Sequence, residues 1–119
     1  MAEYRLTHAA QADIVAILAW SDEQFGQEAR TRYETLIAAA IRDAASRTHD
    51  VGHTPRPELG DGVFSWHLAH SRTRAPGKTV RRPRHFLICR RQDHVVVIGR
   101  VLHDAMELQR HIDPQQPWE

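Results

Sequence analysis

The N-terminal half of the chain has the hydrophobic spacing of a short strand followed by two helices. Residues 4–6 alternate in polarity and predict a first strand, after which the hydroxyl of Thr7 can cap a helix by accepting a backbone N–H. From residue 8 to about 24, and from about 27 to 46, apolar residues recur at intervals typical of amphipathic helices. Gly26 separates the two segments and lets the chain reverse. The predicted apolar faces are Ala10, Ile14, Ile17, Leu18 and Phe25 in the first helix, and Ala29, Tyr33, Leu36, Ile37, Ala40, Ile41 and Ala44 in the second.

The C-terminal half has the pattern of three strands joined by loops. Residues 48–62 are rich in His, Pro, Gly and Asp and predict a connecting loop. Strands are predicted from Val63 toward His70, over residues 85–91 and over residues 95–102, and the second of these is apolar on both faces, which is typical of a central strand. The remaining predicted segments are a loop at 71–83 with Pro76-Gly77 at its tip, a tight turn at Gln92-Asp93, and a last short helix that Asp104 caps and that ends near residue 110.

This order of elements predicts one α+β domain over residues 1–119, a length close to the commonest domain size. Two helices separate the first strand from the next, so the first strand cannot pair with it through a hairpin and must join the sheet elsewhere. We expect an N-terminal strand, a two-helix hairpin, a three-stranded antiparallel meander and a short C-terminal helix. They form one curved sheet with the helices on one face.

Composition places the chain among ordinary globular proteins, with 41% hydrophobic and 26% charged residues. The single cysteine, Cys89, cannot form an internal disulfide, so nothing calls for an oxidising compartment. The chain opens on no charged-then-apolar leader and holds no apolar run near the roughly 18 residues that span a bilayer. We therefore expect a cytoplasmic protein that does not enter a membrane.

Positive charge is concentrated in the second half of the chain. Residues 1–62 hold six Arg against ten acids, whereas residues 63–119 hold nine Arg and one Lys against five acids. Between residues 72 and 91 there are eight cations and no Asp or Glu. Such a field favours a polyanion or an acidic protein surface as partner, and the alternative is a solvated loop. The candidate binding residues are Arg72, Arg74, Arg81, Arg82, Arg84, Arg90, Arg91 and Arg100.

The sequence offers little specific catalytic chemistry. The nine His are scattered, and no spacing predicts a metal site or a cofactor loop, while Cys89 in a predicted central strand reads as a small buried hydrophobe. Metal-independent RNA cleavage needs a base, a cation for the phosphate and an acid. His85, Arg100 and His103 lie near predicted strand ends and permit that role without specifying it. Trp66 or Phe86 could stack a base, although packing is the commoner role of such aromatics.

Four segments of the chain, in this order, resemble the RelE/ParE toxin superfamily of type II toxin–antitoxin systems. The resemblance extends over nearly the whole chain, and the long segment at 71–83 departs from many ParE-like members. The similar segments are residues 6–14, Phe25-Gly26, residues 56–60, and residues 100–108 with Arg110-His111 after them.

The resemblance implies a toxin held inactive by a cognate antitoxin. ParE-like members are associated with inhibition of DNA gyrase, whereas RelE-like members cut mRNA on the ribosome, often with a tyrosine near the C-terminus. The chain has no such tyrosine, which favours the ParE branch. The implied partner is an antitoxin with an acidic segment that is disordered until bound, forming a hetero-oligomer; DNA gyrase is the implied target, and the ribosome is the target in the ribonuclease alternative. A third alternative is a non-toxic partner-binding domain.

Three aromatic residues of the predicted hairpin, Trp20, Phe25 and Tyr33, have two readings. They could present a dimer or antitoxin surface, but we expect them to lie partly in the core, as most aromatics do.

Overall fold

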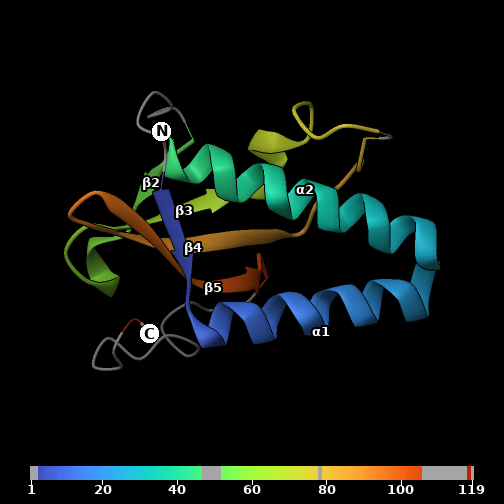
Figure 1. Cartoon of the computed structure of the whole chain (residues 1–119), viewed down its shortest axis with the longest axis horizontal. Coiled ribbons are helices and arrows are strands. Elements are labelled where there is room, and N and C mark those ends of the chain that lie inside the picture. The colour runs from blue at the N-terminus through green and yellow to red at the C-terminus, as the bar shows by residue number, and fades with distance from the viewer. Residues whose placement is uncertain (1–2, 47–51, 78, 106–117, 119) are drawn as a thin grey trace.

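The computed structural model describes residues 3–46, 52–77, 79–105 and 118, and within them the chain forms a five-stranded sheet covered by a helical hairpin (Figure 1). The helices are α1 (His8–Phe25) and α2 (Gln27–Ala45), with two short 3₁₀ helices, η1 (Pro57–Leu59) and η2 (Leu68–Ser71). The strands are β1 (Glu3–Leu6), β2 (Thr54–Pro55), β3 (Val63–His67), β4 (His85–Gln92) and β5 (Val95–His103).

The strand order is β1-β5-β4-β3-β2, which makes β4 the central strand, as its apolar sequence predicts. Strands β3, β4 and β5 form the expected antiparallel meander. Strand β1 pairs with β5 in parallel, so it joins the sheet beyond the meander, as the intervening helices require. The predicted α+β architecture is confirmed.

The structure corrects three boundaries. Strand β2 lies inside the segment predicted to be a loop and pairs antiparallel with β3 at the edge of the sheet. Strand β3 stops at His67, because the next four residues coil into η2. The turn between β4 and β5 falls one residue later than predicted, with Asp93 at a φ of 56°. The predicted C-terminal helix lies outside the described residues.

Thr7 joins the first strand to the first helix, as predicted. Its hydroxyl accepts a hydrogen bond from the N–H of Ala10 at 3.0 Å and donates one to the carbonyl of Gly99 at 2.7 Å. Its own N–H donates to the carbonyl of Ile98 at 3.0 Å. The start of α1 is therefore fixed to β5. At the other end of this helix Gly26 has a φ of 92°, a left-handed conformation that a glycine adopts without strain.

The main core lies between the helical hairpin and one face of the sheet. Trp66 and Leu87 from the sheet and Leu36 from α2 are buried there, and Cys89 is the small buried residue that the sequence predicts. Burial raises the pKa of the Cys89 thiol. The face of the sheet away from the helices carries a second, smaller cluster, made of Leu59, Val63, Phe86, Ile88 and Leu102, against which Trp118 packs. Both Trp66 and Phe86 are packing residues, as expected.

Phe25 does not lie in the core, contrary to its predicted place on the apolar face of the first helix. Its side chain is 68% exposed. The helices are longer than the sheet, so the closed end of the hairpin projects past the strand ends and has no sheet beneath it (Figure 1). Periodicity places Phe25 on the correct side of α1 but does not indicate where the sheet ends.

Candidate binding cleft

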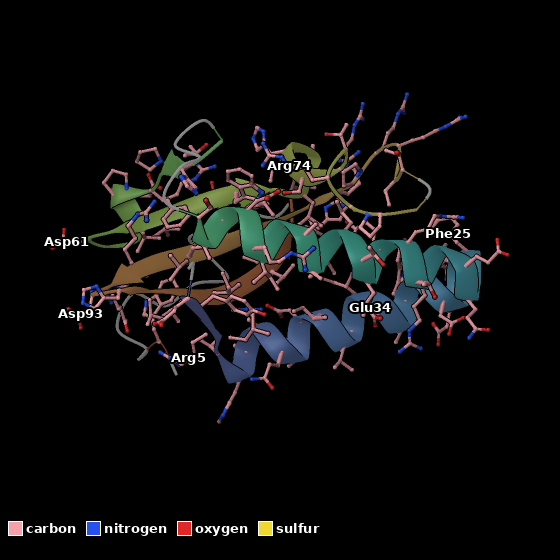
Figure 2. The ribbon with its side chains drawn as sticks, turned by 45° about the horizontal axis from the view of Figure 1, so that its top comes forward. Arg5, Phe25, Glu34, Asp61, Arg74 and Asp93 are labelled. Atoms are coloured by element: carbon pink, nitrogen blue, oxygen red, sulfur yellow. The ribbon has the colours of Figure 1, made fainter. Side chains whose placement is uncertain are left out.

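A cleft of about 550 Å³ lies between the projecting part of the hairpin and the basic loop that precedes β4. Figure 2 shows Phe25 at the closed end of the hairpin, below the loop that follows Arg74. The cleft is lined by Ile17, Trp20, Ser21, Phe25, Ala29, Arg32, Tyr33, Thr79, Val80, Arg81, Arg82, Arg84, His85 and His103. It thus unites both helices with the loop and with the adjacent ends of β4 and β5.

The helical wall of this cleft is apolar. The side chain of Trp20 is 53% exposed, and its ring meets that of Phe25 edge to face with centroids 5.6 Å apart. Ile17 and Ala29 extend this wall, and Val80 adds an apolar side chain to the cleft from the basic loop. Large exposed aromatic rings beside one another are unfavourable in water and mark a surface that a partner can cover. The structure therefore favours the surface reading of Trp20 and Phe25 over the core reading.

The rim of the cleft is positively charged. Arg81, Arg82 and Arg84 from the basic loop face Arg32 of α2 across it, and none of the described residues that line the cleft is an Asp or Glu. Of the eight candidate binding residues, these three loop arginines lie at the cleft. Sequence reasoning missed Arg32, because the arginines of the second helix are interspersed with acids and give no local concentration of charge.

The other predicted cations are dispersed. Arg72 donates a hydrogen bond to the carbonyl of Arg81 at 2.9 Å and so braces the loop from within. Arg74 forms an ion pair with Asp43 of α2 at 3.2 Å. On β4, Arg91 stacks over the ring of Phe64 at 5.1 Å, and its neighbour Arg90 is half-buried. The basic sequence therefore does not fold into one continuous patch.

Arg100 lies at the junction between α1 and β5. Its guanidinium donates to both carboxylate oxygens of Asp13, at 2.7 and 3.0 Å. Of the residues named for RNA cleavage, the structure brings His85 and His103 together, with ring centroids 5.3 Å apart, and holds Arg100 against Asp13.

Tyr33 reaches from α2 to the start of β4 and fixes the ring of His85. The hydroxyl oxygen of Tyr33 accepts the N–H of Arg84 at 3.2 Å and lies 2.6 Å from Nδ1 of His85, to which we assign its proton. Burial raises the pKa of Tyr33 to about 12. Burial, with the nearby ring of His103, lowers the pKa of His85 to about 4. At neutral pH both groups are uncharged.

Asp104 anchors Arg84 behind the cleft. Its carboxylate accepts hydrogen bonds from Nε of Arg84 and Nε2 of His67, each at 3.1 Å, and these donors, with His67 first, hold its pKa below the usual value. The helix that Asp104 is predicted to cap lies outside the described residues. Sequence reasoning missed this role, since His67 and Arg84 lie 37 and 20 residues away in the chain.

The described residues contain no evident metal site, since no group of three His, Cys, Asp or Glu side chains among them is placed to hold a metal ion. Nor does any helix in the described ranges combine the length and apolarity needed to cross a bilayer.

Comparison with known proteins decides the family. Residues 4–108 match the family of ParE toxins of the type II toxin–antitoxin system parDE. The chain belongs to the ParE toxin family. The predicted resemblance to the RelE/ParE superfamily, and to its ParE branch, is thereby confirmed.

A solved structure supports the fold of this ParE toxin. The chain is similar to a protein of the chromosomal ParDE toxin–antitoxin system from P. aeruginosa, with a TM-score of 0.64 and 17% sequence identity. The likeness covers 87% of this chain and 96% of the other. No curated protein matches the sequence.

Proposed function

We propose that this ParE-family toxin inhibits DNA gyrase in the cytoplasm and is neutralised by an antitoxin segment that occupies the cleft. The observation that carries the antitoxin part is the cleft itself, with its exposed aromatic wall and its rim of four arginines. An amphipathic acidic segment complements both features, because its apolar side chains cover Trp20 and Phe25 and its carboxylates meet the rim. Such a segment can remain disordered until it binds.

Gyrase as the target rests on membership of the ParE family. The exposed arginines of the basic loop are suited to an acidic surface on gyrase or to the DNA that gyrase holds. If antitoxin and target use overlapping parts of this surface, occupation of the cleft by the antitoxin explains neutralisation by direct competition.

The ribonuclease alternative has weaker geometric support. A general base needs a free nitrogen lone pair, and Nδ1 of His85 already accepts the proton of Tyr33. Nδ1 of His103 accepts the N–H of Ala105 at 3.1 Å. The guanidinium of Arg100 is held by Asp13. These contacts occupy Nδ1 of both histidines and engage the guanidinium, which weakens the case for a free base and a free cation at this site.

Expression of the toxin alone in a bacterium separates the functions. Gyrase inhibition predicts SOS induction and filamentation with intact mRNA, whereas the RelE-like activity predicts rapid translation arrest with codon-specific cuts. Absence of any growth effect would favour the non-toxic binding domain. His103→Ala adds a check, since it should abolish cleavage only under the ribonuclease alternative.

The antitoxin is the protein encoded beside the toxin, recognisable by a ribbon–helix–helix pattern and an acidic tail. Calorimetric titration with this protein tests the cleft. Replacing Arg81, Arg82 and Arg84 with Glu should weaken binding by about 2–5 kcal/mol, because rim attraction becomes repulsion. The matched control replaces Arg5, Arg42 and Arg91 with Glu. These three arginines have the same charge as the loop arginines but lie outside the cleft. Equal affinity of the two triple variants would show that the basic loop lies outside the interface.

A further inference from the structure

We propose that His85 and His103, supported by Arg84, form a subsite at the sheet end of the cleft that binds one Asp or Glu carboxylate of the occupying segment. This inference rests on the proposed function and names the chemistry of one contact within it. The subsite consists of the paired ring nitrogens Nε2 of the two histidines and the guanidinium beside them.

The first step is the tautomer of each ring. Nδ1 of His103 accepts the backbone N–H of Ala105, and Nδ1 of His85 is assigned as the acceptor of the Tyr33 hydroxyl proton, 2.6 Å away. A neutral imidazole carries one proton, so a ring whose Nδ1 is an acceptor holds that proton on Nε2. Both rings are therefore fixed as donors at Nε2, one by a tyrosine from α2 and the other by the backbone.

The second step is the placement of the two donors. His85 and His103 are direct partners in the register of β4 and β5, and their rings meet at an angle of 83°. Both line the cleft, and within the described ranges neither Nε2 has a hydrogen-bond partner. Adjacent strand ends thus place two donor rings side by side in the cleft lining, with centroids 5.3 Å apart. Since both groups donate and neither accepts, the matching ligand is an acceptor with more than one oxygen.

The third step is charge. Arg84 also lines the cleft, and Asp104 fixes its guanidinium from outside the lining, with Nη2 at 3.1 Å from the carboxylate. The Asp104 carboxylate also lies 3.7 Å from Nδ1 of His103. Arg84 offsets the charge of this carboxylate and His67 donates to it, so Arg81 and Arg82 give the cleft its net positive charge. An anionic acceptor is favoured over a neutral carbonyl. In a cleft with an aromatic wall suited to a peptide, the anion is a side-chain carboxylate.

Asparagine and glutamine substitutions distinguish the role of Nδ1 from that of Nε2 in each histidine. Asn offers an oxygen near the position of Nδ1 and so keeps the contact with Tyr33 or Ala105 while it removes the donor at Nε2. Gln places its amide near Nε2 and so keeps a donor while it loses the structural contact. We expect the variant with His85→Asn and His103→Asn to bind a synthetic peptide of the antitoxin's acidic segment about 10–100-fold more weakly. The corresponding double Gln variant should retain most of the affinity.

Peptide variants locate the carboxylate. Replacing each Asp or Glu of the peptide in turn by its amide should reveal one position whose loss costs the wild-type toxin about tenfold in affinity and costs the double Asn variant nothing. Unchanged affinity of the double Asn variant, with sensitivity to the Arg81, Arg82 and Arg84 substitutions intact, would overturn the subsite and leave the cleft as the antitoxin site. A peptide that does not bind the wild-type toxin would overturn both.

Two further readouts complete the test. Long-range ¹H–¹⁵N spectra of the free toxin should show His85 and His103 protonated on Nε2, and a proton on Nδ1 of either ring would contradict the donor pair. A single-stranded oligonucleotide serves as the phosphate probe. If it binds, loses affinity in the double Asn variant and displaces the peptide, then the subsite takes phosphate and the assignment to carboxylate is wrong.

Discussion

The Arg100 guanidinium and the Asp13 carboxylate form a two-point contact that closes an exposed strand edge. Strand β1 pairs with β5 only as far as Ile98, so the N–H of Val101 lies past the end of that pairing. This N–H donates to the same Asp13 carboxylate at 2.9 Å. One side chain of α1 therefore satisfies both a backbone donor and a cation of β5, and the contact holds helix and strand together.

Loss of this contact should reduce stability without affecting antitoxin binding. We expect Asp13→Asn and Arg100→Met each to lower the free energy of unfolding by about 1–3 kcal/mol, because each removes charge-assisted hydrogen bonds between the guanidinium and the carboxylate. Urea denaturation measures the change, and Arg42→Met on the exposed side of α2 is the control, expected within about 0.5 kcal/mol of wild type. If the Arg100→Met variant folds correctly but binds the antitoxin more weakly, Arg100 is a binding residue, as the sequence predicts.

His85 makes stability depend on pH in a defined direction. Its pKa is about 4 in the folded protein against an ordinary value of 6.5, so the unfolded chain takes up the proton first as the pH falls. His85 therefore lowers stability as the pH falls from about 6.5 to 4 and makes no such contribution above that range. His85→Asn keeps an acceptor for Tyr33 and does not titrate. Because the ring is partly exposed, we expect the wild type to lose only about 1–2 kcal/mol relative to this variant on acidification. Parallel pH profiles of the two unfolding free energies would contradict this account.

The sequence predicts the roles of single residues within their own elements, but it does not predict which residues far apart in the chain contact each other. The capping role of Thr7 follows from the residue type and the helix after it, and the burial of Cys89 follows from the apolar strand around it. By contrast, Tyr33 meets His85 across 52 residues, and Asp13 meets Arg100 across 87. Hydrophobic periodicity indicates which side of an element is buried but carries no information about which polar side chains face each other after folding.

The helices and long strands are predicted because their periodicity extends over many residues. Strand β2 is only two residues long and contains Pro55, which cannot donate to a neighbouring strand, so no pattern indicates it. From the sequence, an exposed surface is only the less favoured of two readings of Trp20 and Phe25. The exposed aromatic wall arises because α1 and α2 run past the sheet, a relation between element lengths in space rather than a property of either helix.

Gly99 lies at an irregularity in β5, and the ring of Trp118 packs against it. Ile88 and Cys89 of β4 pair with Arg100 and Ile98, so Gly99 is the extra residue of a bulge. A Cβ atom at Gly99 would overlap the Trp118 indole. We expect Gly99→Ala to expel this ring and to cost about 1–3 kcal/mol of stability.

A double-mutant cycle checks that prediction. Trp118→Ala alone removes the ring from the small cluster on the helix-free face. If Gly99→Ala acts by displacing the ring, the double variant should be no less stable than the worse single variant in thermal unfolding. Fully additive losses would mean that the alanine disturbs the bulge itself.

Across the whole molecule, charge and apolar surface converge on the cleft from different parts of the sequence. The helical half carries ten acids against six arginines and contributes the aromatic wall, while the basic second half contributes three of the four rim arginines. The segregation of charge along the chain predicts the cationic loop. It does not predict that α2 lies opposite the loop, which depends on the helical hairpin packing across the sheet.

Because the cleft combines a charged rim with an apolar wall, substitutions in the rim and in the wall should change the salt dependence of antitoxin binding in different ways. Charges screened by salt lose their effect as the Debye length shortens from about 10 Å at 0.1 M to about 3 Å at 1 M, whereas apolar contacts do not weaken with added salt. Neutralising Arg81, Arg82 and Arg84 with Gln should lower the association rate at low salt and flatten its dependence on ionic strength. Trp20→Ala with Phe25→Ala should accelerate dissociation by a similar factor at every salt concentration, with stability unchanged because both rings are exposed. Stopped-flow kinetics at several salt concentrations measure both effects, and identical salt slopes for the two variants would rule out a cleft with separate steering and anchoring surfaces.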